Sequence, residues 1–247
     1  MNNAPRTNSV ILVSYYVYLQ KTSYMESLFE TQQRLIEEIK EKAKEIDPTI
    51  GPIWDGVADI QAYLNSSPRV AWILKEPYED NPSEEGWSHP ELLSRLTLNE
   101  IDSGLTWKRV NETMFALRNH CSFQETTLVD GNYLKDIAWL NLSKMPGKSL
   151  SDDLYIKHYK MYWTDILKKQ VEAYDPEILI FGNTFDVCKK DLFPDGFELI
   201  NKTPIIHIYK SNGRLLLFPY HPGWWGVDDE SYVNPIIQAI QGHYAGK

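Results

Sequence analysis

The segment of residues 215–226 restricts the fold of this chain more than any other. It opens with an apolar run over 215–218, which the turn pair Asn212-Gly213 precedes, and continues through Pro219, His221 and Pro222. A short apolar run between turn signals predicts a buried strand, and proline ends strand pairing. His221 is therefore expected just beyond the carboxyl end of a strand, which is where open α/β sheets bind their ligands.

Three further strands are predicted, because short apolar runs over residues 69–74, 136–142 and 177–181 each lead into a loop containing proline or glycine. Residues 205–209 predict one more short strand or hairpin arm. Helices are predicted over residues 26–46, 57–64, 92–117 with a break at Ser103-Gly104, 152–174, a segment ending at 192, and 233–243. Strands that alternate with helices imply a mostly parallel sheet with both faces covered. We predict an α/β fold, a three-layer sandwich with a central, mostly parallel four-stranded sheet and helices on both faces.

The domain organisation predicted from the sequence is one α/β domain over residues 25–247. Met25 opens a sequence typical of a helix start, so residues 1–24 are interpreted as an N-terminal extension that need not belong to the native domain. Within them the apolar run of residues 10–19 is too short to span a bilayer. We expect a cytoplasmic protein without a membrane partner, and a monomer.

Charge and cysteine content exclude some functions. The net charge of -9 gives the chain no general attraction for nucleic acid, so a nucleic-acid site would need a local basic patch. Such a strip could be built from Lys135, Lys144, Lys148, Lys157, Lys160, Lys168 and Lys169. Cys121 and Cys188 cannot supply a four-cysteine zinc site or an iron–sulfur cluster by themselves.

Polar and aromatic side chains lie at or just beyond the ends of the four predicted strands. They are Glu76 and Tyr78, then Asn141 and Lys144, then Asn183, and finally His221 with Trp224 and Trp225. A carboxylate can orient water, an amide can pair with the edge of a nucleobase, and a histidine can donate to a developing anion. These types of side chain at one sheet edge favour a catalytic or binding crevice.

Four of these segments resemble motifs of the uracil-DNA glycosylase superfamily. They are Lys75-Glu76-Pro77-Tyr78, Leu140-Asn141-Leu142, residues 175–182 and Tyr220-His221-Pro222-Gly223, in the family's order. The resemblance extends from about residue 69 to the C-terminus. It implies a hydrolase of DNA repair that excises uracil or another deaminated base from DNA, with no metal or organic cofactor.

The resemblance also implies roles for individual residues. Glu76 would orient the attacking water, and His221 would donate to the base as the glycosidic bond breaks. Tyr78, Trp87, Asn141 and Asn183 would bind the substrate, with Trp87 stacked on the base and Asn141 reading its edge. Contacts with nucleic acid would come from Ser143, Lys144, Lys148, Gly223, Trp224 and Trp225.

Departures from the family pattern leave alternatives open. Leu74-Lys75 stands where most members have glycine, and Gly223 replaces a serine that commonly contacts phosphate. Residues 79–91 are acidic and contain no lysine or arginine. A second hypothesis is therefore a non-catalytic protein of the same fold that binds a nucleobase, a nucleotide or a protein. A third is a metal-dependent phosphoesterase using Glu76, Glu79, Asp80 and His221.

Overall fold

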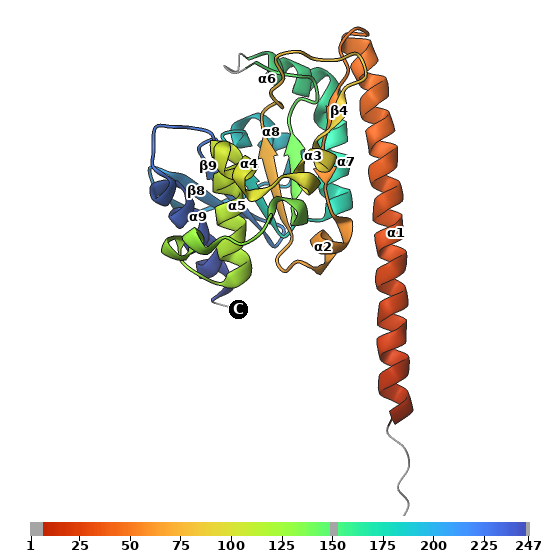
Figure 1. Ribbon diagram of the computed structural model, residues 1–247, viewed down its shortest axis with the longest axis vertical. Helices are drawn as coiled ribbons and strands as arrows, with labels where there is room; N and C mark the ends of the chain where they lie inside the picture. Colours follow the sequence, from red (N-terminus) through yellow and green to blue (C-terminus); the bar gives the residue numbers. More distant parts are fainter. Residues whose placement is uncertain (1–6, 149–152, 246–247) are drawn as a thin grey trace, which may run out of the picture.

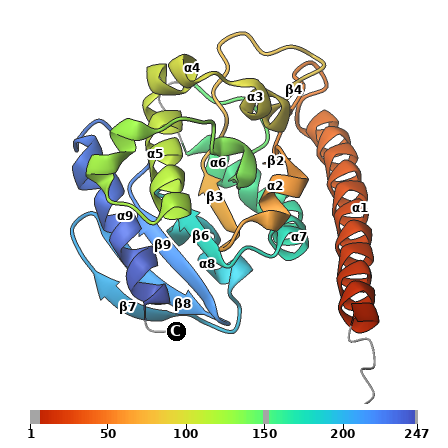
Figure 2. The same cartoon turned by 60° about the horizontal axis from the view of Figure 1, so that its bottom comes forward.

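The computed structural model describes residues 7–148 and 153–245, with side chains described from residue 23 onward. Helices and strands alternate along an α/β body, and the long helix α1 (Thr7–Ile46) runs along one side of that body (Figures 1 and 2). The predicted mixed α/β class is confirmed.

The main sheet has seven strands in the order β2-β5-β3-β6-β9-β8-β7. Its centre is β5 (Ala138–Asn141), β3 (Val70–Leu74), β6 (Ile178–Phe181) and β9 (Arg214–Pro219), and these four strands pair in parallel. Three antiparallel strands extend the edges, namely β2 (Gly56–Val57) beside β5, and β8 (Ile206–Ser211) and β7 (Glu198–Lys202) beyond β9.

The prediction of a four-stranded sheet was therefore wrong in its strand count. All five residues of β7 are exposed, so this strand has no apolar run that a sequence pattern could reveal. β2 has only two residues, too few to show any period. A separate two-stranded sheet, β1 (Ile53–Trp54) with β4 (Trp87–Ser88), escaped prediction for the same reason.

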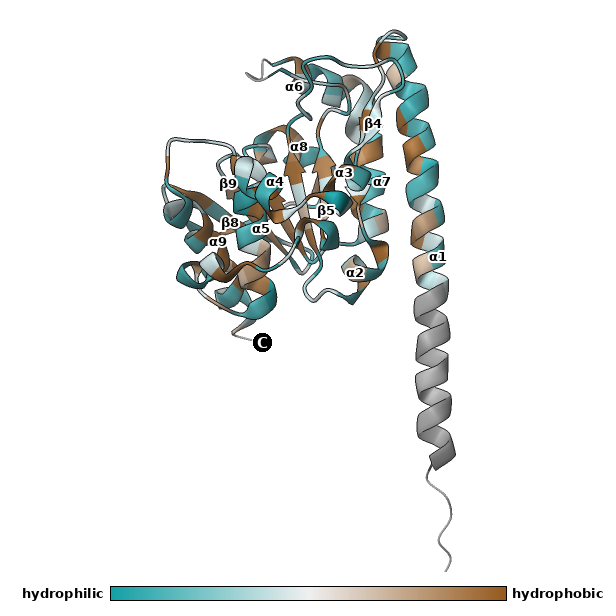
Figure 3. Cartoon of the chain, viewed as in Figure 1, coloured by the Kyte–Doolittle hydropathy of each residue, from teal (hydrophilic) through white to brown (hydrophobic). Residues whose placement is uncertain are grey.

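Hydrophobic cores cover both faces of the sheet. Alternate residues of β3 face opposite sides, so Ala71 and Ile73 belong to one core while Trp72 and Leu74 belong to the other. The first core is completed by α1, α2 (Ile60–Asn65), α7 (Thr164–Tyr174) and α8 (Phe185–Leu192). The second is completed by α3 (His89–Arg95), α4 (Leu98–Ser103), α5 (Leu105–Asn119) and α9 (Asp229–Tyr244). Figure 3 shows hydrophobic colouring on the central strands and hydrophilic turns on the outer helices.

Local signals explain where the helices begin and break. Thr97 starts α4 through a capping box with Glu100, and Gly104 separates α4 from α5 at the predicted break. The helix predicted over 152–174 is α6 (Leu154–His158), a π-helical stretch η3 (Tyr159–Trp163) and α7. Two 3₁₀ turns, η1 (Phe123–Leu128) and η2 (Leu134–Asp136), lead from α5 toward β5.

Helix α1 begins earlier than the predicted start at residue 26. It is continuous from Thr7 to Ile46, so the backbone has no break at Met25. The buried positions on the described part of α1 begin at Leu28 and include Ile39 and Ala43. Whether residues 1–24 belong to the native domain stays a prediction. Within the described residues, no helix combines the length and the apolar character needed to cross a membrane.

Candidate functional site

The carboxyl ends of the four parallel strands lie on the same side of the sheet, and a pocket of about 780 Å³ lies beside them. The end of β3 supplies Lys75 and Glu76, the end of β6 supplies Asn183, and the end of β9 supplies His221. Among the described residues, the lining is Lys75, Glu76, Tyr78, Thr106, Lys148, Asn183, Tyr220, His221, Gly223, Trp224 and Trp225.

Most of the residues predicted from sequence meet in this pocket. Those that line it are Glu76, Tyr78, Lys148, Asn183, His221, Gly223, Trp224 and Trp225. Trp87, Asn141, Ser143 and Lys144 are not among the lining residues. Lys75, Thr106 and Tyr220 line it without having been given a role from sequence.

His221 is held in one protonation state by its surroundings. Its Nδ1 accepts a hydrogen bond from the backbone N–H of Gly223 at 3.0 Å, which places the imidazole proton on Nε2. Burial lowers the pKa of His221 to about 4, and the positive charge of Lys75 acts in the same direction. At neutral pH the ring is therefore a neutral N–H donor.

Gly182 lies in close contact with the ends of β3 and β9 beside the pocket. A Cβ added to Gly182, which directly follows β6, would lie 2.5 Å from Leu74 Cδ2 and 2.9 Å from Pro222 Cδ. Only a residue without a side chain fits between the ends of β3 and β9. Gly182 therefore lets these two strand ends approach each other at the pocket.

Glu76 is positioned by the neighbouring loop that contains Gly147. The backbone N–H of Gly147 donates to the Pro77 carbonyl at 2.7 Å, and Tyr78 pairs with Gly147 in an isolated bridge. A Cβ on Gly147 would lie 2.0 Å from Glu76 Cγ. Burial raises the pKa of Tyr155, and the charge of Glu76 raises it further, so the carboxylate lies near that phenol.

An arginine that the sequence analysis did not single out holds the wall formed by residues 222–227. Arg109 of α5 is fully buried, and its guanidinium donates to the carbonyls of Pro222, Trp224 and Val227 at 3.1, 2.7 and 2.6 Å. Its Nε donates to Asp229 Oδ1 at 2.7 Å. A charged residue among the buried positions of α5 was the one available signal, since its partners are far away in sequence.

Aromatic rings form the outer rim of the pocket. The rings of Tyr220 and Trp224 lie 4.1 Å apart between centroids at an angle of 38°. Trp225 is 86% exposed, and Tyr78 is exposed on the opposite loop. Flat, accessible rings beside a pocket suit a planar ligand such as a nucleobase.

Lys144 has a structural role that conflicts with the predicted contact to nucleic acid. Its ammonium is completely buried and donates to both carboxylate oxygens of Asp55, at 2.8 and 2.6 Å, and to Gln170 Oε1 at 2.9 Å. Ser143 is also buried, and its hydroxyl accepts from the Met145 backbone N–H. Neither side chain has a surface to offer a phosphate.

The predicted lysine strip is likewise interrupted. Lys160 pairs with Asp191 and Lys169 with Glu38, each at 2.6 Å. Of the lysines in that strip, Lys148 alone is a pocket-lining residue. The positive charges that reach the pocket therefore come from Lys75 and Lys148.

Asn141, at the end of β5, and Trp87, in β4, are outside the lining of the pocket. Asn141 is 2% exposed and pairs in register with Leu74, the residue before Lys75. The Trp87 ring lies 5.8 Å from His89, which in turn lies 5.0 Å from Trp139. Within the described residues, Asn141 Nδ2 and Trp87 Nε1 are buried without a hydrogen-bond partner. Their predicted contacts with a base stay predictions.

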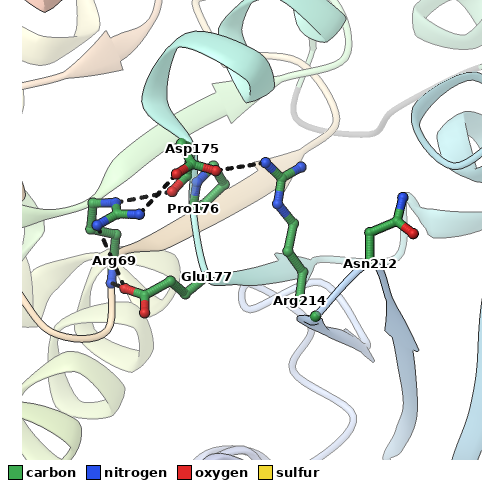
Figure 4. A pocket seen from close by; sticks show the side chains of 7 residues that line it. Arg69, Asp175, Pro176, Glu177, Asn212 and Arg214 are labelled. Atoms are coloured by element: carbon green, nitrogen blue, oxygen red, sulfur yellow. Dashed lines mark hydrogen bonds and ion pairs between the residues drawn. The ribbon is translucent and has the colours of Figure 1, made fainter.

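A second pocket lies at the opposite edge of the sheet, where the parallel strands begin (Figure 4). Arg69 and Arg214 both donate to the carboxylate of Asp175, at 3.0 and 2.8 Å. Arg69 also lies 3.8 Å from Glu177. Because these charges neutralise one another, we interpret this cluster as structural. Its ion pairs connect the starts of β3, β6 and β9.

In residues 23–148 and 153–245, no three histidine, cysteine or acidic side chains are grouped so that they could bind a metal ion. The phosphoesterase hypothesis gains no support from this geometry.

Comparisons with known proteins do not identify a family. No protein-family model matches the chain, and no curated protein is significantly similar to it.

Proposed function

We propose that this protein is a uracil-DNA glycosylase-like hydrolase that cleaves the N-glycosidic bond of uracil or another deaminated base in DNA. The observation that carries the proposal is the meeting of Glu76 and neutral His221 in one pocket at the carboxyl ends of β3 and β9. We take the parallel strands β5, β3, β6 and β9, with helices on both faces, as the mostly parallel four-stranded centre that the sequence pattern predicts.

In the proposed reaction, water attacks C1′ of the deoxyribose while the bond from C1′ to the base nitrogen breaks. The bonding electron pair leaves with the base, which departs as an anion. Glu76 orients the water and accepts its proton, and its negative charge also stabilises the oxocarbenium-like sugar. The base anion later takes a proton from solvent.

His221 suits the leaving-group side of this reaction. A neutral imidazole with its proton on Nε2 donates a hydrogen bond to the base oxygen where negative charge develops. Because Nδ1 is already an acceptor for Gly223, the ring cannot turn its basic nitrogen toward the base without losing that bond.

A target base would have to leave its stack to reach this pocket, as in other enzymes that act on bases. The exposed rings of Tyr78, Trp224 and Trp225 around the pocket could receive an extruded nucleotide. Gly223 lies against α5, because a Cβ at this position would fall 2.6 Å from Thr106 Oγ1. Thr106 thus supplies a hydroxyl beside the position where related proteins carry serine.

A second candidate function is non-catalytic binding of a nucleobase, a nucleotide or a protein partner on the same fold. The charge distribution favours it, since the net charge is -9 and the exposed loop of residues 80–85 beside Tyr78 contains Asp80, Glu84 and Glu85. Two lysines at the pocket offer a DNA backbone little attraction.

An abasic-site assay separates the two candidates. The full chain is incubated with single- and double-stranded oligonucleotides containing one uracil, hypoxanthine or xanthine, in low salt with EDTA, and abasic sites are cleaved by alkali. The proposal expects strand breaks that disappear in His221→Ala and Glu76→Gln but persist in the matched control His207→Ala, a histidine of β8 outside the pocket. A folded protein that cleaves none of these substrates would support the binding function instead.

A further inference from the structure

Lys75, like Lys148, is a pocket-lining lysine that has no role in the proposed reaction. It follows β3 directly and precedes Glu76. Its ammonium lies 5.4 Å from the centroid of the Tyr155 ring. Within the described residues its side chain makes no hydrogen bond or ion pair of the kind that Lys144, Lys160 and Lys169 make. Lys75 thus brings an available positive charge to the pocket.

The positive charge of Lys75 lies close enough to His221 to affect it. The two residues line the same pocket from β3 and β9, which flank β6 in the sheet. They are close enough for the charge of Lys75 to disfavour a proton on His221 and so lower the pKa of that imidazole. Burial is the main cause of the lowered pKa of His221, and the positive charge of Lys75, which acts in the same direction, attracts a negative charge to the pocket that both residues line.

We propose that Lys75 binds the departing base as an anion together with His221, and so makes the site selective for oxo-bases that leave as anions. This inference rests on the proposed glycosidic cleavage. When the C1′–N bond breaks, its electron pair delocalises from the ring nitrogen onto the neighbouring carbonyl oxygens of the base. His221 Nε2–H donates to one part of this anion, and the ammonium of Lys75 stabilises the rest by charge.

The same positive charge discriminates against amino-bases. Adenine and its relatives leave most easily after protonation of the ring, which creates a cation. A cation beside Lys75 and a neutral imidazole is disfavoured by like-charge repulsion. The expected substrates are therefore uracil and xanthine rather than an unmodified or alkylated amino-base.

A binding experiment tests this without any turnover. The probe is free 5-nitrouracil, whose ring N–H ionises near neutral pH, titrated by quenching of tryptophan fluorescence on both sides of that ionisation. We expect the full chain to bind the anion at least about ten-fold more tightly than the neutral form, as one added charge contact allows. Lys75→Met should abolish this preference, and Lys75→Arg should restore most of it.

Two controls keep the result specific to Lys75. Lys190→Met removes an exposed lysine of α8 outside the pocket and should leave the preference unchanged. Inorganic phosphate is the competing anion. If phosphate displaces the probe through Lys75 more effectively than uracil anions do, the residue serves a phosphate site and the proposal is overturned.

A kinetic experiment tests the leaving-group role itself. Single-turnover rates are compared for oligonucleotides carrying uracil and 5-fluorouracil, the second being the better leaving group. Lys75→Met should slow release of uracil by about 10- to 100-fold, comparable to or below the loss of one oxyanion donor, and slow release of 5-fluorouracil less. Equal rates in Lys75→Met and the unaltered chain would overturn the inference.

The failure of this inference differs from failure of the proposed function. Absence of cleavage by the unaltered chain, together with anion binding that depends on Lys75, would contradict the glycosylase function and leave the anion site standing. Cleavage that Lys75→Met does not slow would support the glycosylase function and contradict the role of Lys75. Unfolding curves for each variant exclude misfolding, and methionine keeps an apolar stem of similar length while it removes the charge.

Discussion

His221 gives the pocket a pH response that differs from that of an ordinary histidine. Protonation of Nδ1 would place a second donor against the Gly223 N–H, so the loop geometry needs the neutral ring. With a pKa lowered to about 4, this state persists well below neutrality. We expect the acidic limb of kcat/KM that reports His221 to lie near pH 4. A limb near pH 6.5, measured over pH 3.5 to 8, would contradict the assigned environment.

The same shift predicts how stability depends on pH. Between the folded pKa of about 4 and the ordinary value of 6.5, the unfolded chain binds more protons at this site than the folded chain does. The contribution of His221 to stability is therefore complete above about pH 6.5 and is lost as the pH falls toward 4. Urea unfolding of His221→Asn should show a shallower dependence on pH in this window than the unaltered chain.

Gly147 controls the position of Glu76. A methyl group at this position would overlap Glu76 Cγ at 2.0 Å and would push the carboxylate from its place. Since a displacement of about 1 Å can cost roughly 100-fold in rate, Gly147→Ala should lose activity far more than stability. Gly242→Ala in α9, where a Cβ meets nothing within 4 Å, is the matched control. Equal activity of the two variants would mean that Glu76 tolerates the displacement.

At the scale of elements, α5 holds the loop of residues 222–227 through Arg109. The guanidinium satisfies three carbonyls and one carboxylate while it is buried. Arg109→Met leaves the three carbonyls without this donor and Asp229 with Lys108 alone, so we expect a loss of about 3 to 5 kcal/mol in the free energy of unfolding. Lys108→Met, which removes a more exposed partner of Asp229, should cost about 1 kcal/mol or less. Equal losses of unfolding free energy in urea titrations of the two variants would contradict this role of Arg109.

The elements show how far the sequence predicts this fold. Strands β3, β5, β6 and β9 were predicted because each is an apolar run, and their parallel pairing then placed Glu76, Asn183 and His221 at one edge. The edge strand β7 was missed because all its side chains are exposed. Local pattern cannot find an element that buries no apolar face.

Contacts between residues far apart in sequence are a second reason why the site could not be fully predicted from the sequence. The loop sequence around Lys144 is typical of an exposed lysine. In the structure Lys144 is buried, because it pairs with Asp55, which lies 89 residues away in the sequence. The partners of Arg109 lie 113 to 120 residues away. Such pairs depend on how the elements pack, so neither the loss of Lys144 from the site nor the role of Arg109 could be predicted from a local motif.

For the whole molecule, we predict that the α/β body folds without the part of α1 that precedes Met25. The described residues of α1 before Leu28 are exposed or half-buried, and the core begins to use the helix at Leu28. A chain that starts at Met25 should therefore unfold at the same urea concentration as the full chain and keep the same pocket activity. A loss of more than about 2 kcal/mol, well beyond the usual effect of surface changes, would show that residues 1–24 belong to the domain.

The proposed function requires that the pocket breaks a glycosidic bond and releases a free base. The most direct measurement is mass spectrometry of the products after a uracil-containing oligonucleotide is incubated with the full chain in EDTA. We predict free uracil and an abasic strand in equal amounts, increasing over several turnovers, and none from His221→Ala or Glu76→Gln. An intact oligonucleotide after incubation with the folded, unaltered chain would contradict the claim.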